Sequence, residues 1–353
     1  MKSFLNLIIL VVLFLSYSCT EKETSKVEKD FNDYAKFFRI SGDQLTVFNP
    51  EGSDSIHFYK QDIDVSKIAI QSTTQLAFLE EFGKSDLVAA IPYANYICHS
   101  VIINKLNEGT VREILSGDAM NIEFIVIDEI KLMLLGDYTD YKNPKVNQIR
   151  SFNVATIPIL DWKEVHPLAR AEWIKVIGWM LNEEAKANKI FQSIERKYTN
   201  LKDSLVSNIS FKDSPKVFSG ISHKDNWFIP GGHSYLAQLI KDAGGSYLFE
   251  TNEDIGSFHV SFEHVFMLLN EADIWLASVN TRSMHELVSR DLRVDKANVV
   301  IQNKVFGNGK QVCQQGGNKY WSEGVVKPDR ILRDFYEVFH GDDKKTYFLQ
   351  KLR

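Results

Sequence analysis

The stretch WFIPGGHSYLAQLIKDAGG, from Trp227 to Gly245, holds two glycine pairs that could bind a phosphate group. Glycine-rich loops that lead into a helix often do so, because the first backbone N–H groups of the helix point at the anion. A phosphate loop would need GxxxxGK followed by Ser or Thr, or GxGxxG directly after a strand. Neither pattern is present. Apolar residues at helical spacing instead predict a core-facing helix that the second glycine pair closes: Leu236, Leu239, Ile240 and Ala243.

Residues that could bind a metal or perform catalysis occur, but they do not form a recognised pattern. The histidines are scattered without an HxxxH or HExxH pair, and His99, next to Cys98, is the best single candidate for a metal ligand. Because a lone histidine is more often structural, we predict no metal site. Ser219 and Ser257 lie outside a GxSxG elbow, and spacing gives no Ser-His-Asp set. We therefore expect neither an enzyme nor a resident cofactor.

Strands and helices alternate in two blocks of the chain, which is typical of an α/β fold. In the first block, apolar runs predict strands at Ile68–Ile70, Leu87–Ile91, Leu132–Leu135 and Thr156–Leu160, with helices at 73–82 and Ile122–Ile130. The second block has strands at Lys216–Gly220 and Asp273–Ala277, and helices at Ser234–Ala243, Phe262–Asn270 and Pro328–His340. A hairpin of Leu45–Phe48 and Ser55–Tyr59 precedes both blocks, and the short apolar run Val299–Ile301 leads into an irregular loop that reaches Trp321.

The two blocks are separated by a segment almost free of glycine, in which apolar residues recur at helical spacing. The piece from Glu183 to Leu205 predicts one helix of about 34 Å, at 1.5 Å per residue. A rod of this length could span a two-lobed protein.

The N-terminal segment MKSFLNLIILVVLFLSYSC has an early lysine, an apolar run that is short for a membrane span, and small residues before a cysteine. These features are typical of a secretory signal. Cys19, directly after Ser18, resembles a bacterial lipoprotein box in which the cysteine is lipidated, although Tyr17 makes the box a loose one. An ordinary secretory signal cut near Ser18 and a tethering helix are the alternatives. The charged stretch Thr20–Lys29 predicts a flexible tether.

Charge and cysteine content limit the partners and the cross-links. The net charge of -5 leaves no basic stripe to neutralise phosphates, so we do not expect nucleic acid as a partner. Besides Cys19 only Cys98 and Cys313 remain, and no CxxC occurs. A bond between two such distant cysteines requires a geometry that the sequence does not give. We expect free thiols, with a disulfide as the alternative.

Several stretches, taken together, resemble a known family. WFIPGGHSYLAQLIKDAGGSYLF, followed by SFEHVFMLLNEADIWL, resembles the C-terminal lobe of ABC-transporter substrate-binding proteins for iron complexes, haem and cobalamin. HPLARAEWIK, from His166 to Lys175, and YWSEGVVKPDRILRDFYEVFH, from Tyr320 to His340, are similar to stretches of the lipoprotein members. The resemblance follows the family's order from about Ile68 to His340.

The resemblance implies an α/β fold of two Rossmann-like lobes joined by a single long rigid helix, with the ligand cleft between the lobes. The predicted helix from Glu183 to Leu205 matches that joint, which permits only small closure motions. The expected divisions are a lipoprotein signal peptide at 1–18, a flexible tether at 19–30, an N-terminal α/β lobe at 31–160, a linker with the bridging helix at 161–206 and a C-terminal α/β lobe at 207–353.

The same resemblance assigns a role to two carboxylates. Family members carry one surface glutamate on each lobe that pairs with arginines of the membrane permease, and the matching positions are Glu123 in MNIEFI and Glu263 in VSFEHV. Exposed charges of this kind steer docking. Alternatively, each is a solvated acidic residue that the helix dipole favours in the first turn. The first lobe is the more divergent one, since Ile130–Lys131 stands where the family usually has Pro-Asp.

The candidates for the ligand cleft lie in loops at strand ends, where such clefts are lined. Most are aromatic, which suits a flat apolar macrocycle or a catecholate, and one arginine could meet a carboxylate: Tyr93, Tyr96, Trp162, Trp227, Arg282, Tyr320 and Trp321. Trp227 and Trp321 could instead belong to the core of a lobe, and Arg282 to a surface salt bridge.

The resemblance thus implies a monomeric substrate-binding lipoprotein on the periplasmic side of a bacterial membrane. It would capture a ferric siderophore, haem or cobalamin and deliver it to an ABC permease. The alternative is a divergent surface or interaction lipoprotein that keeps the fold without a transport role.

Overall fold

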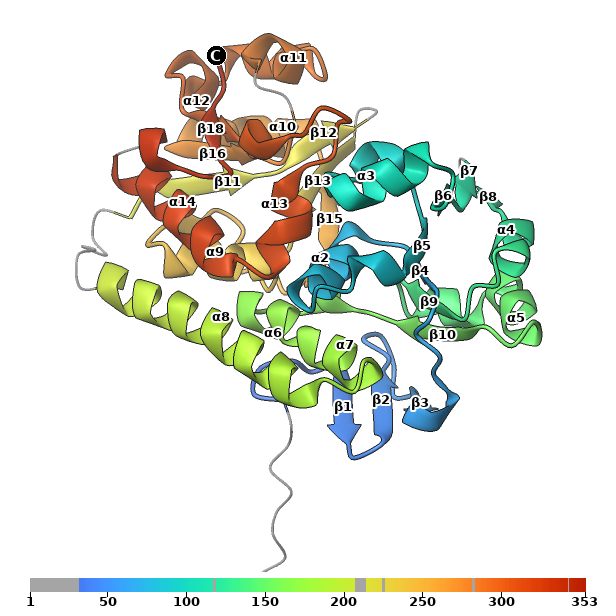
Figure 1. Ribbon diagram of the computed structural model, residues 1–353. Helices are drawn as coiled ribbons and strands as arrows, with labels where there is room; N and C mark the ends of the chain where they lie inside the picture. Colours follow the sequence, from blue (N-terminus) through green and yellow to red (C-terminus); the bar gives the residue numbers. More distant parts are fainter. Residues whose placement is uncertain (1–31, 117–118, 207–213, 224–225, 281–282, 342) are drawn as a thin grey trace, which may run out of the picture. The chain divides into compact units, whose positions relative to one another are not determined.

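The computed structural model describes residues 32–353 except 117–118, 207–213, 224–225, 281–282 and 342, and these residues form one compact unit (Figure 1). The unit contains two five-stranded sheets and three smaller antiparallel sheets. The predicted signal peptide, the tether and Cys19 lie outside the described residues. Within the described ranges, no helix combines the length and the apolar character that a membrane span requires.

The first large sheet is entirely parallel, with the order β10-β9-β4-β5-β6. Its strands are β4 (Ile68–Ile70), β5 (Val88–Ile91), β6 (Arg112–Glu113), β9 (Leu132–Leu135) and β10 (Ala155–Pro158). Every residue of β4 and β9 is buried, as is usual for the central strands of a parallel sheet. The chain first builds outward from β4 to β6 and then returns to β9, so the direction of winding reverses between β4 and β9.

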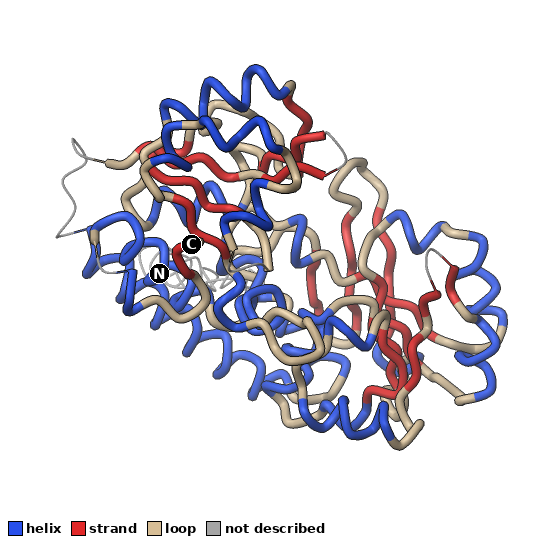
Figure 2. Tube along the Cα trace, turned by 90° about the horizontal axis from the view of Figure 1, so that it is seen from above, coloured by secondary structure: helices blue, strands red, loops and turns tan. Residues whose placement is uncertain are grey.

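The second large sheet has the order β14-β11-β16-β17-β18 and is parallel except for its last strand. Its strands are β11 (Lys216–Ser219), β14 (Ser246–Tyr247), β16 (Ile274–Ala277), β17 (Val305–Gly307) and β18 (Gln350–Lys351). Here the winding reverses between β11 and β16. The two sheets form separate groups of strands (Figure 2), and we call the parts built on them the N-terminal and the C-terminal lobe. The predicted α/β fold with two lobes is confirmed.

Three helices link the lobes: α6 (Pro167–Glu172), α7 (Ile174–Met180) and α8 (Glu184–Val206). Helix α8 is the predicted rod, and its 23 residues make it the longest helix in the described ranges. Near its start, the Lys186 ammonium group donates to the Phe82 carbonyl oxygen of the N-terminal lobe at 2.9 Å. Near its end, the Tyr198 hydroxyl donates to Asp242 at 2.7 Å and Lys202 pairs with the same carboxylate at 2.8 Å. One helix is therefore fixed to both lobes.

The remaining elements flank these sheets. The helices of the N-terminal lobe are α2 (Thr73–Glu81), α3 (Ser100–Asn107), α4 (Ile122–Ile127) and α5 (Pro144–Ser151). Those of the C-terminal lobe are α9 (Tyr235–Asp242), α10 (Phe262–Glu271), α11 (Met284–Val288), α12 (Asn298–Ile301), α13 (Lys319–Ser322) and α14 (Pro328–His340). The small sheets comprise β1 (Phe38–Ser41), β2 (Gln44–Phe48) and β3 (Ser55–Tyr59); β7 (Leu115–Ser116) and β8 (Ala119–Met120); and β12 (Ile221–His223), β13 (Asn226–Pro230) and β15 (Ser257–Val260).

The structure corrects two of the predicted elements and assigns a third segment that the sequence left open. The helix predicted to end at Ile130 ends at Ile127, because Glu129 takes a left-handed conformation with φ of 52° and breaks the helix. The run Val299–Ile301 is helical and forms most of α12. The segment predicted as an irregular loop before Trp321 contains strand β17 and most of helix α13.

Two buried glutamates hold the segment that precedes β1. Glu172 of α6 accepts hydrogen bonds from the backbone N–H groups of Asp33, Tyr34 and Ala35 at 2.7–2.8 Å. Glu164 accepts from the N–H groups of Lys36 and Phe37 and from the Trp173 indole. Both carboxylates are fully buried, so each would be costly to keep without these donors.

The Glu164 carboxyl group should make stability depend on pH. Burial raises its pKa from 4.5 to about 7, against the smaller opposite effect of its backbone donors. The folded state therefore binds this proton more tightly than the unfolded state, and the free energy of unfolding should fall as pH rises from about 5 to about 8, by roughly 2 kcal/mol from this group. Glu164→Gln should remove that share of the pH dependence, because glutamine does not titrate. The local contacts should be kept, since all three donors reach Oε1, which glutamine retains. Urea unfolding at about pH 5 and about pH 8 measures the free energy of unfolding of both proteins. An equal fall in this free energy in the two proteins would contradict the prediction.

Candidate functional site

The carboxyl ends of the central strands in both lobes meet at one cavity. In open α/β sheets, ligands bind outside the carboxyl ends of the strands, where the winding reverses. A cavity of about 370 Å³ lies at this position between the two lobes. It is lined by residues that follow β4 and β5 in the N-terminal lobe and by residues beyond β16 and β17 in the C-terminal lobe: Gln71, Ser72, Thr73, Pro92, Tyr96, Asn280, Gly316, Asn318 and Trp321. We call it the central cavity.

Amide side chains form much of its polar lining. Gln71 directly follows β4, and its Oε1 accepts a hydrogen bond from the Gly136 N–H at 2.7 Å, which ties β4 to the end of β9. Across the cavity, Asn318 donates from Nδ2 to Asn280 Oδ1 at 2.8 Å and to the Asn308 carbonyl oxygen at 3.0 Å. These bonds fix the amides within each lobe. In the part of the chain that the structure describes, the side chains that line the central cavity are neutral.

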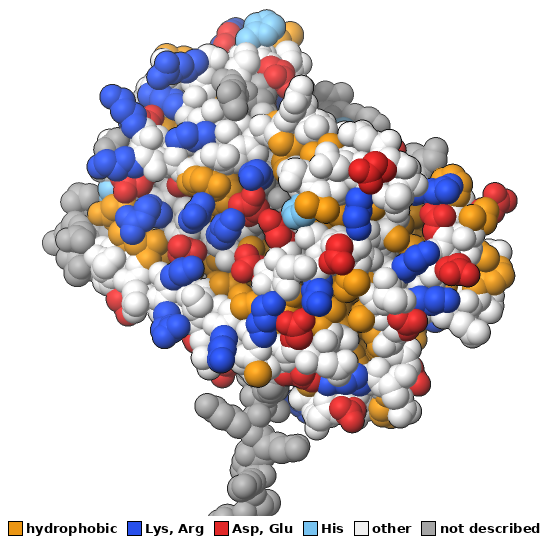
Figure 3. Space-filling model, viewed as in Figure 1, with side chains coloured by type: hydrophobic (Ala, Val, Ile, Leu, Met, Phe, Trp, Pro, Cys, Tyr) orange, Lys and Arg blue, Asp and Glu red, His pale blue; other side chains and the backbone are white. Residues whose placement is uncertain are grey.

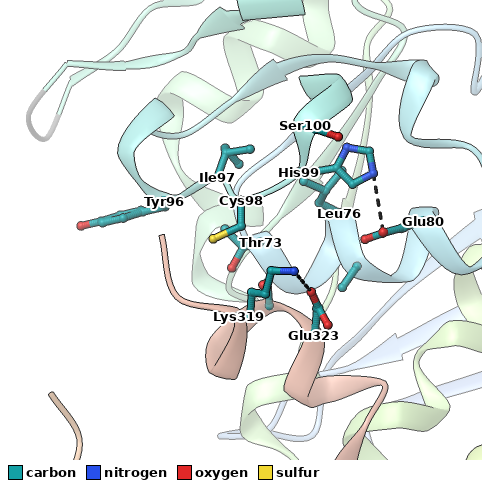
Figure 4. A pocket seen from close by; sticks show the side chains of 12 residues that line it. Thr73, Leu76, Glu80, Tyr96, Ile97, Cys98, His99, Ser100, Lys319 and Glu323 are labelled. Atoms are coloured by element: carbon teal, nitrogen blue, oxygen red, sulfur yellow. Dashed lines mark ion pairs between the residues drawn. The ribbon is translucent and has the colours of Figure 1, made fainter. Parts of the chain in front are cut away.

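Two further spaces adjoin the central cavity, one smaller than it and one slightly larger. One of about 180 Å³ shares Thr73 and Tyr96 with it and is more polar. There His99 lies 3.7 Å from Glu80, and Lys319 lies 2.9 Å from Glu323 (Figure 4). The other, of about 410 Å³, shares Gln71 with the central cavity and extends along the N-terminal lobe. The three spaces therefore adjoin one another along the carboxyl edge of the first sheet.

A larger hollow of about 840 Å³ lies elsewhere, along α9 and the loop after β14. Apart from Lys36 and Val165 its lining comes from the C-terminal lobe, and it contains no residue that follows β4, β5, β9 or β16. Topology therefore favours the central cavity as the ligand site, although this hollow is wider.

Cys98 and Cys313 form a disulfide, which corrects the expectation of free thiols. Their Cα atoms are 5.7 Å apart although 215 positions separate the residues in the sequence. Cys98 belongs to the loop between β5 and α3, and Cys313 to the segment between β17 and α13. The bond therefore joins the two lobes, and Cys98 also lines the smallest of the three spaces (Figure 4).

Two of the predicted cleft residues line the central cavity, and two lie beside it. Tyr96 and Trp321 are in the lining, and both are well exposed. Tyr93 packs edge-on against Tyr96 with ring centroids 5.3 Å apart. Trp162 is exposed and donates from its indole to the Gly136 carbonyl oxygen at 2.7 Å, outside the central cavity.

Trp227 and Tyr320 belong to the core, which corrects their assignment to the cleft. Trp227 is 1% exposed because alternate residues of β13 point inward; it packs against Trp275 and donates to Asp291 at 3.2 Å. Tyr320 is 5% exposed, and burial raises its pKa well above the ordinary value. Arg282 lies outside the described residues.

His99, the best single candidate for a metal ligand, lies near the disulfide and not in a metal site. Its Nε2 is 3.3 Å from the Ser85 hydroxyl, and its buried Nδ1 has no hydrogen-bond partner. Among the described residues, no group of three or more His, Cys, Asp or Glu side chains is placed to hold a metal ion.

Glu123 and Glu263 occupy matching places in the two lobes. Each is exposed and lies in the first turn of a helix, α4 or α10, that runs into a strand beside the point where the winding reverses. A helix that feeds a parallel strand starts at the carboxyl edge of the sheet, so both carboxylates lie toward the edges that border the central cavity. Figure 3 shows acidic and basic side chains interspersed on one face of the molecule.

The amides Gln71, Asn280 and Asn318 were not predicted from the sequence. Gln71 and Asn280 could have been found, because they follow two predicted strands at their carboxyl ends, where ligands bind in α/β sheets. Asn318 gives no such signal, since it precedes a four-residue helix that the sequence pattern does not show.

Comparison with known proteins places the chain in a family. The model of the family described as "Periplasmic binding protein" matches residues 134–312, which is half of the 353 residues. The chain belongs to the periplasmic binding protein family. An uncharacterized lipoprotein of Methanocaldococcus jannaschii is similar to this periplasmic binding protein. The two sequences are 22% identical over 304 residues, which cover 82% of this chain and 69% of that protein.

Solved structures show the same two-lobed fold. A periplasmic binding protein from Veillonella parvula matches 86% of this chain and 99% of its own with a TM-score of 0.60 at 12% identity. A petrobactin-binding protein from Bacillus subtilis matches 84% and 99% with a TM-score of 0.56 at 14% identity. A vitamin B12-binding protein of Vibrio cholerae and a haem-binding protein of Roseiflexus sp. RS-1 give TM-scores of 0.54 and 0.55. The predicted resemblance is thus confirmed at the level of the periplasmic binding protein family, and these solved structures share its fold.

Proposed function

We propose that this periplasmic binding protein captures a bulky iron complex or a corrinoid in the central cavity and the two spaces that adjoin it, and delivers it to an ABC permease. The position of the cavity, at the carboxyl ends of both sheets and between the lobes, carries this proposal. The fold is shared with binding proteins for petrobactin, haem and vitamin B12, so ligands of these classes are the first to test. The protein's role is binding and release, without a catalytic step.

The lining favours a ligand with neutral hydrogen-bonding groups and a flat apolar face. In the described ranges, the central cavity presents amides and hydroxyls with the rings of Tyr96 and Trp321, and no charged side chain. Amide groups pair well with the amide side chains that surround a corrin ring. The amides and aromatic rings of the described lining therefore support a corrinoid as the first of the three classes to test.

Binding should require little movement of the lobes. Helix α8 is continuous and is held to each lobe by hydrogen bonds or ion pairs at its two ends. A joint of this kind bends less than a hinge of extended strands, so the ligand enters a site that is largely formed beforehand.

We propose that Glu123 and Glu263 dock the protein on the permease. Both lobes carry the same arrangement, because an exposed apolar side chain follows each glutamate at i+4, on the same face of its helix. These side chains, Ile127 and Met267, are 66% and 59% exposed. A carboxylate beside an apolar contact fits a partner surface with a basic group next to an apolar one.

We further propose that the chain is exported and anchored in the membrane through a lipid on Cys19, with the segment up to residue 30 as a tether. The signal-like N-terminal sequence supports this location, and the Methanocaldococcus jannaschii relative is named a lipoprotein.

Loss of the Trp321 ring should weaken ligand binding. Trp321→Ala removes a large aromatic surface from the cavity wall, and about 2 kcal/mol of lost contact corresponds to a roughly 30-fold lower affinity. Trp162→Ala is the matched control, since this tryptophan is similarly exposed but lies outside the central cavity. Absorbance titration of each protein with cyanocobalamin, haemin and a ferric catecholate measures the affinities. Equal affinities for the two variants would place the ligand elsewhere, and no binding of any probe by the unmodified protein would count against the proposed ligand classes.

A further inference from the structure

The disulfide joins two segments that form opposite walls of the central cavity. On the N-terminal side, the loop from Tyr93 to His99 contributes Tyr96 to the cavity and Cys98 to the bond. On the C-terminal side, the segment from Cys313 to Asn318 contributes Gly316 and Asn318 to the cavity. The cross-link thus lies within two residues of the cavity lining on the N-terminal side and within three on the C-terminal side.

The C-terminal segment is a compact turn held together by its own backbone hydrogen bonds. The Cys313 N–H donates to the Gly317 carbonyl oxygen at 2.8 Å, and the Gly316 N–H donates back to the Cys313 carbonyl oxygen at 2.9 Å. Asn318 closes the turn by a bridge to Val312 and joins it to Asn280 beyond the end of β16. Whatever holds Cys313 therefore also holds Gly316 and Asn318, the cavity residues of the turn.

The turn packs directly against the backbone of the other lobe. A Cβ atom at Gly317 would lie 2.5 Å from the Tyr96 carbonyl oxygen and 3.0 Å from the Cys98 Sγ atom. Real Cβ atoms do not approach a backbone oxygen so closely, so glycine is required for this contact. The lobes are in backbone-to-backbone contact at the disulfide, without room for a side chain between them.

We propose that Cys98 and Cys313 are positioning residues whose disulfide sets the width of the ligand cavity. Helix α8 restrains the lobes at one joint, and the small motions that it permits include twisting and spreading about that joint. With the disulfide as a second covalent connection, the lobes can rotate relative to each other only about the line that joins helix α8 and the disulfide. The cavities on either side share Thr73 and Tyr96, so spreading at this contact would enlarge both of them. The inference goes beyond the proposed function, because it holds for any ligand that occupies the cavity.

Hydrogen exchange of the full-length protein in detergent tests the proposal without a ligand. In Cys98→Ser/Cys313→Ser, amide exchange should accelerate at least tenfold in 93–99 and 313–318, while the core strands β4 and β16 keep their slower exchange. The same local change should appear in the unmodified protein after reduction with tris(carboxyethyl)phosphine, and the double variant should not respond to the reductant. Unchanged exchange in both segments, or acceleration only in step with β4 and β16, would overturn the positioning role.

A second variant keeps both cysteines and so covers the case in which the double variant fails to fold. Gly317→Ala places a methyl group against Tyr96 and Cys98 and should give the same local acceleration, with a higher titre of free thiols. Gly256→Ala is the matched control, because a Cβ there would meet no atom within 4 Å. If Gly317→Ala exchanges like Gly256→Ala, the tight contact does not hold the lobes and the proposal fails.

Discussion

Replacing Cys98 and Cys313 with serine is expected to lower the free energy of unfolding by about 5 kcal/mol. The disulfide spans 215 positions, and a cross-link over so long a loop removes many conformations from the unfolded chain. The loss is large beside the 5–15 kcal/mol that usually stabilises a folded domain, so the variant should unfold at a much lower urea concentration. The effect should equal that of reducing the unmodified protein.

Urea unfolding followed by tryptophan fluorescence, with and without reductant, measures this loss. The single variant Cys98→Ser separates the bond from the residues, because it should be as unstable as the double variant. A loss under about 1 kcal/mol would show that the cross-link constrains the unfolded chain far less than its length implies.

Reversing the charge of both proposed docking glutamates is expected to reduce ligand uptake at least tenfold. In Glu123→Arg/Glu263→Arg, an exposed carboxylate on each lobe becomes a cation, which would repel the basic groups proposed on the permease. Ligand affinity should stay within twofold, because neither residue lines the central cavity and both are exposed. Uptake of the ligand by cells in which the variant replaces the native protein provides the measurement.

Glu271→Arg is the control for this prediction. Glu271 is exposed on α10 as well, but it is the last residue of the helix, two turns away from Glu263. Its reversal should leave uptake unchanged. Normal uptake by the double variant would contradict the docking role. An equal loss of uptake in Glu271→Arg would show that uptake depends on surface negative charge in general and not on the two proposed docking positions.

The sequence predicted elements well where one short-range pattern decides the structure. Ile68–Ile70 forms a strand because a fully apolar run before a capping Ser72 suits the centre of a parallel sheet. The four-residue helix α12 could not be told from a strand, since so short an apolar run has no clear period. Helix α8 was predictable because apolar residues recur at helical spacing along its whole length, a pattern that strands and loops do not produce.

The site was less predictable, because it depends on contacts between distant residues. Trp227 lies in a strand where three apolar residues follow one another, so alternation does not show which of them faces the core. The Cys98–Cys313 bond depends on how two lobes meet, and nothing local to either cysteine records that. Tyr96 and Trp321 were among the cleft candidates because the sequence places them in loops, with the core as the alternative for Trp321, and the structure places both in the lining of the central cavity.

The long separation of the two cysteines also fixes an order of events during biosynthesis. In an exported chain, the N-terminal lobe emerges with Cys98 well before residue 313 has been made, and its thiol has no partner until most of the second lobe has followed. The bond can therefore form only after residue 313 has been made, and its presence marks chains whose synthesis has passed that point.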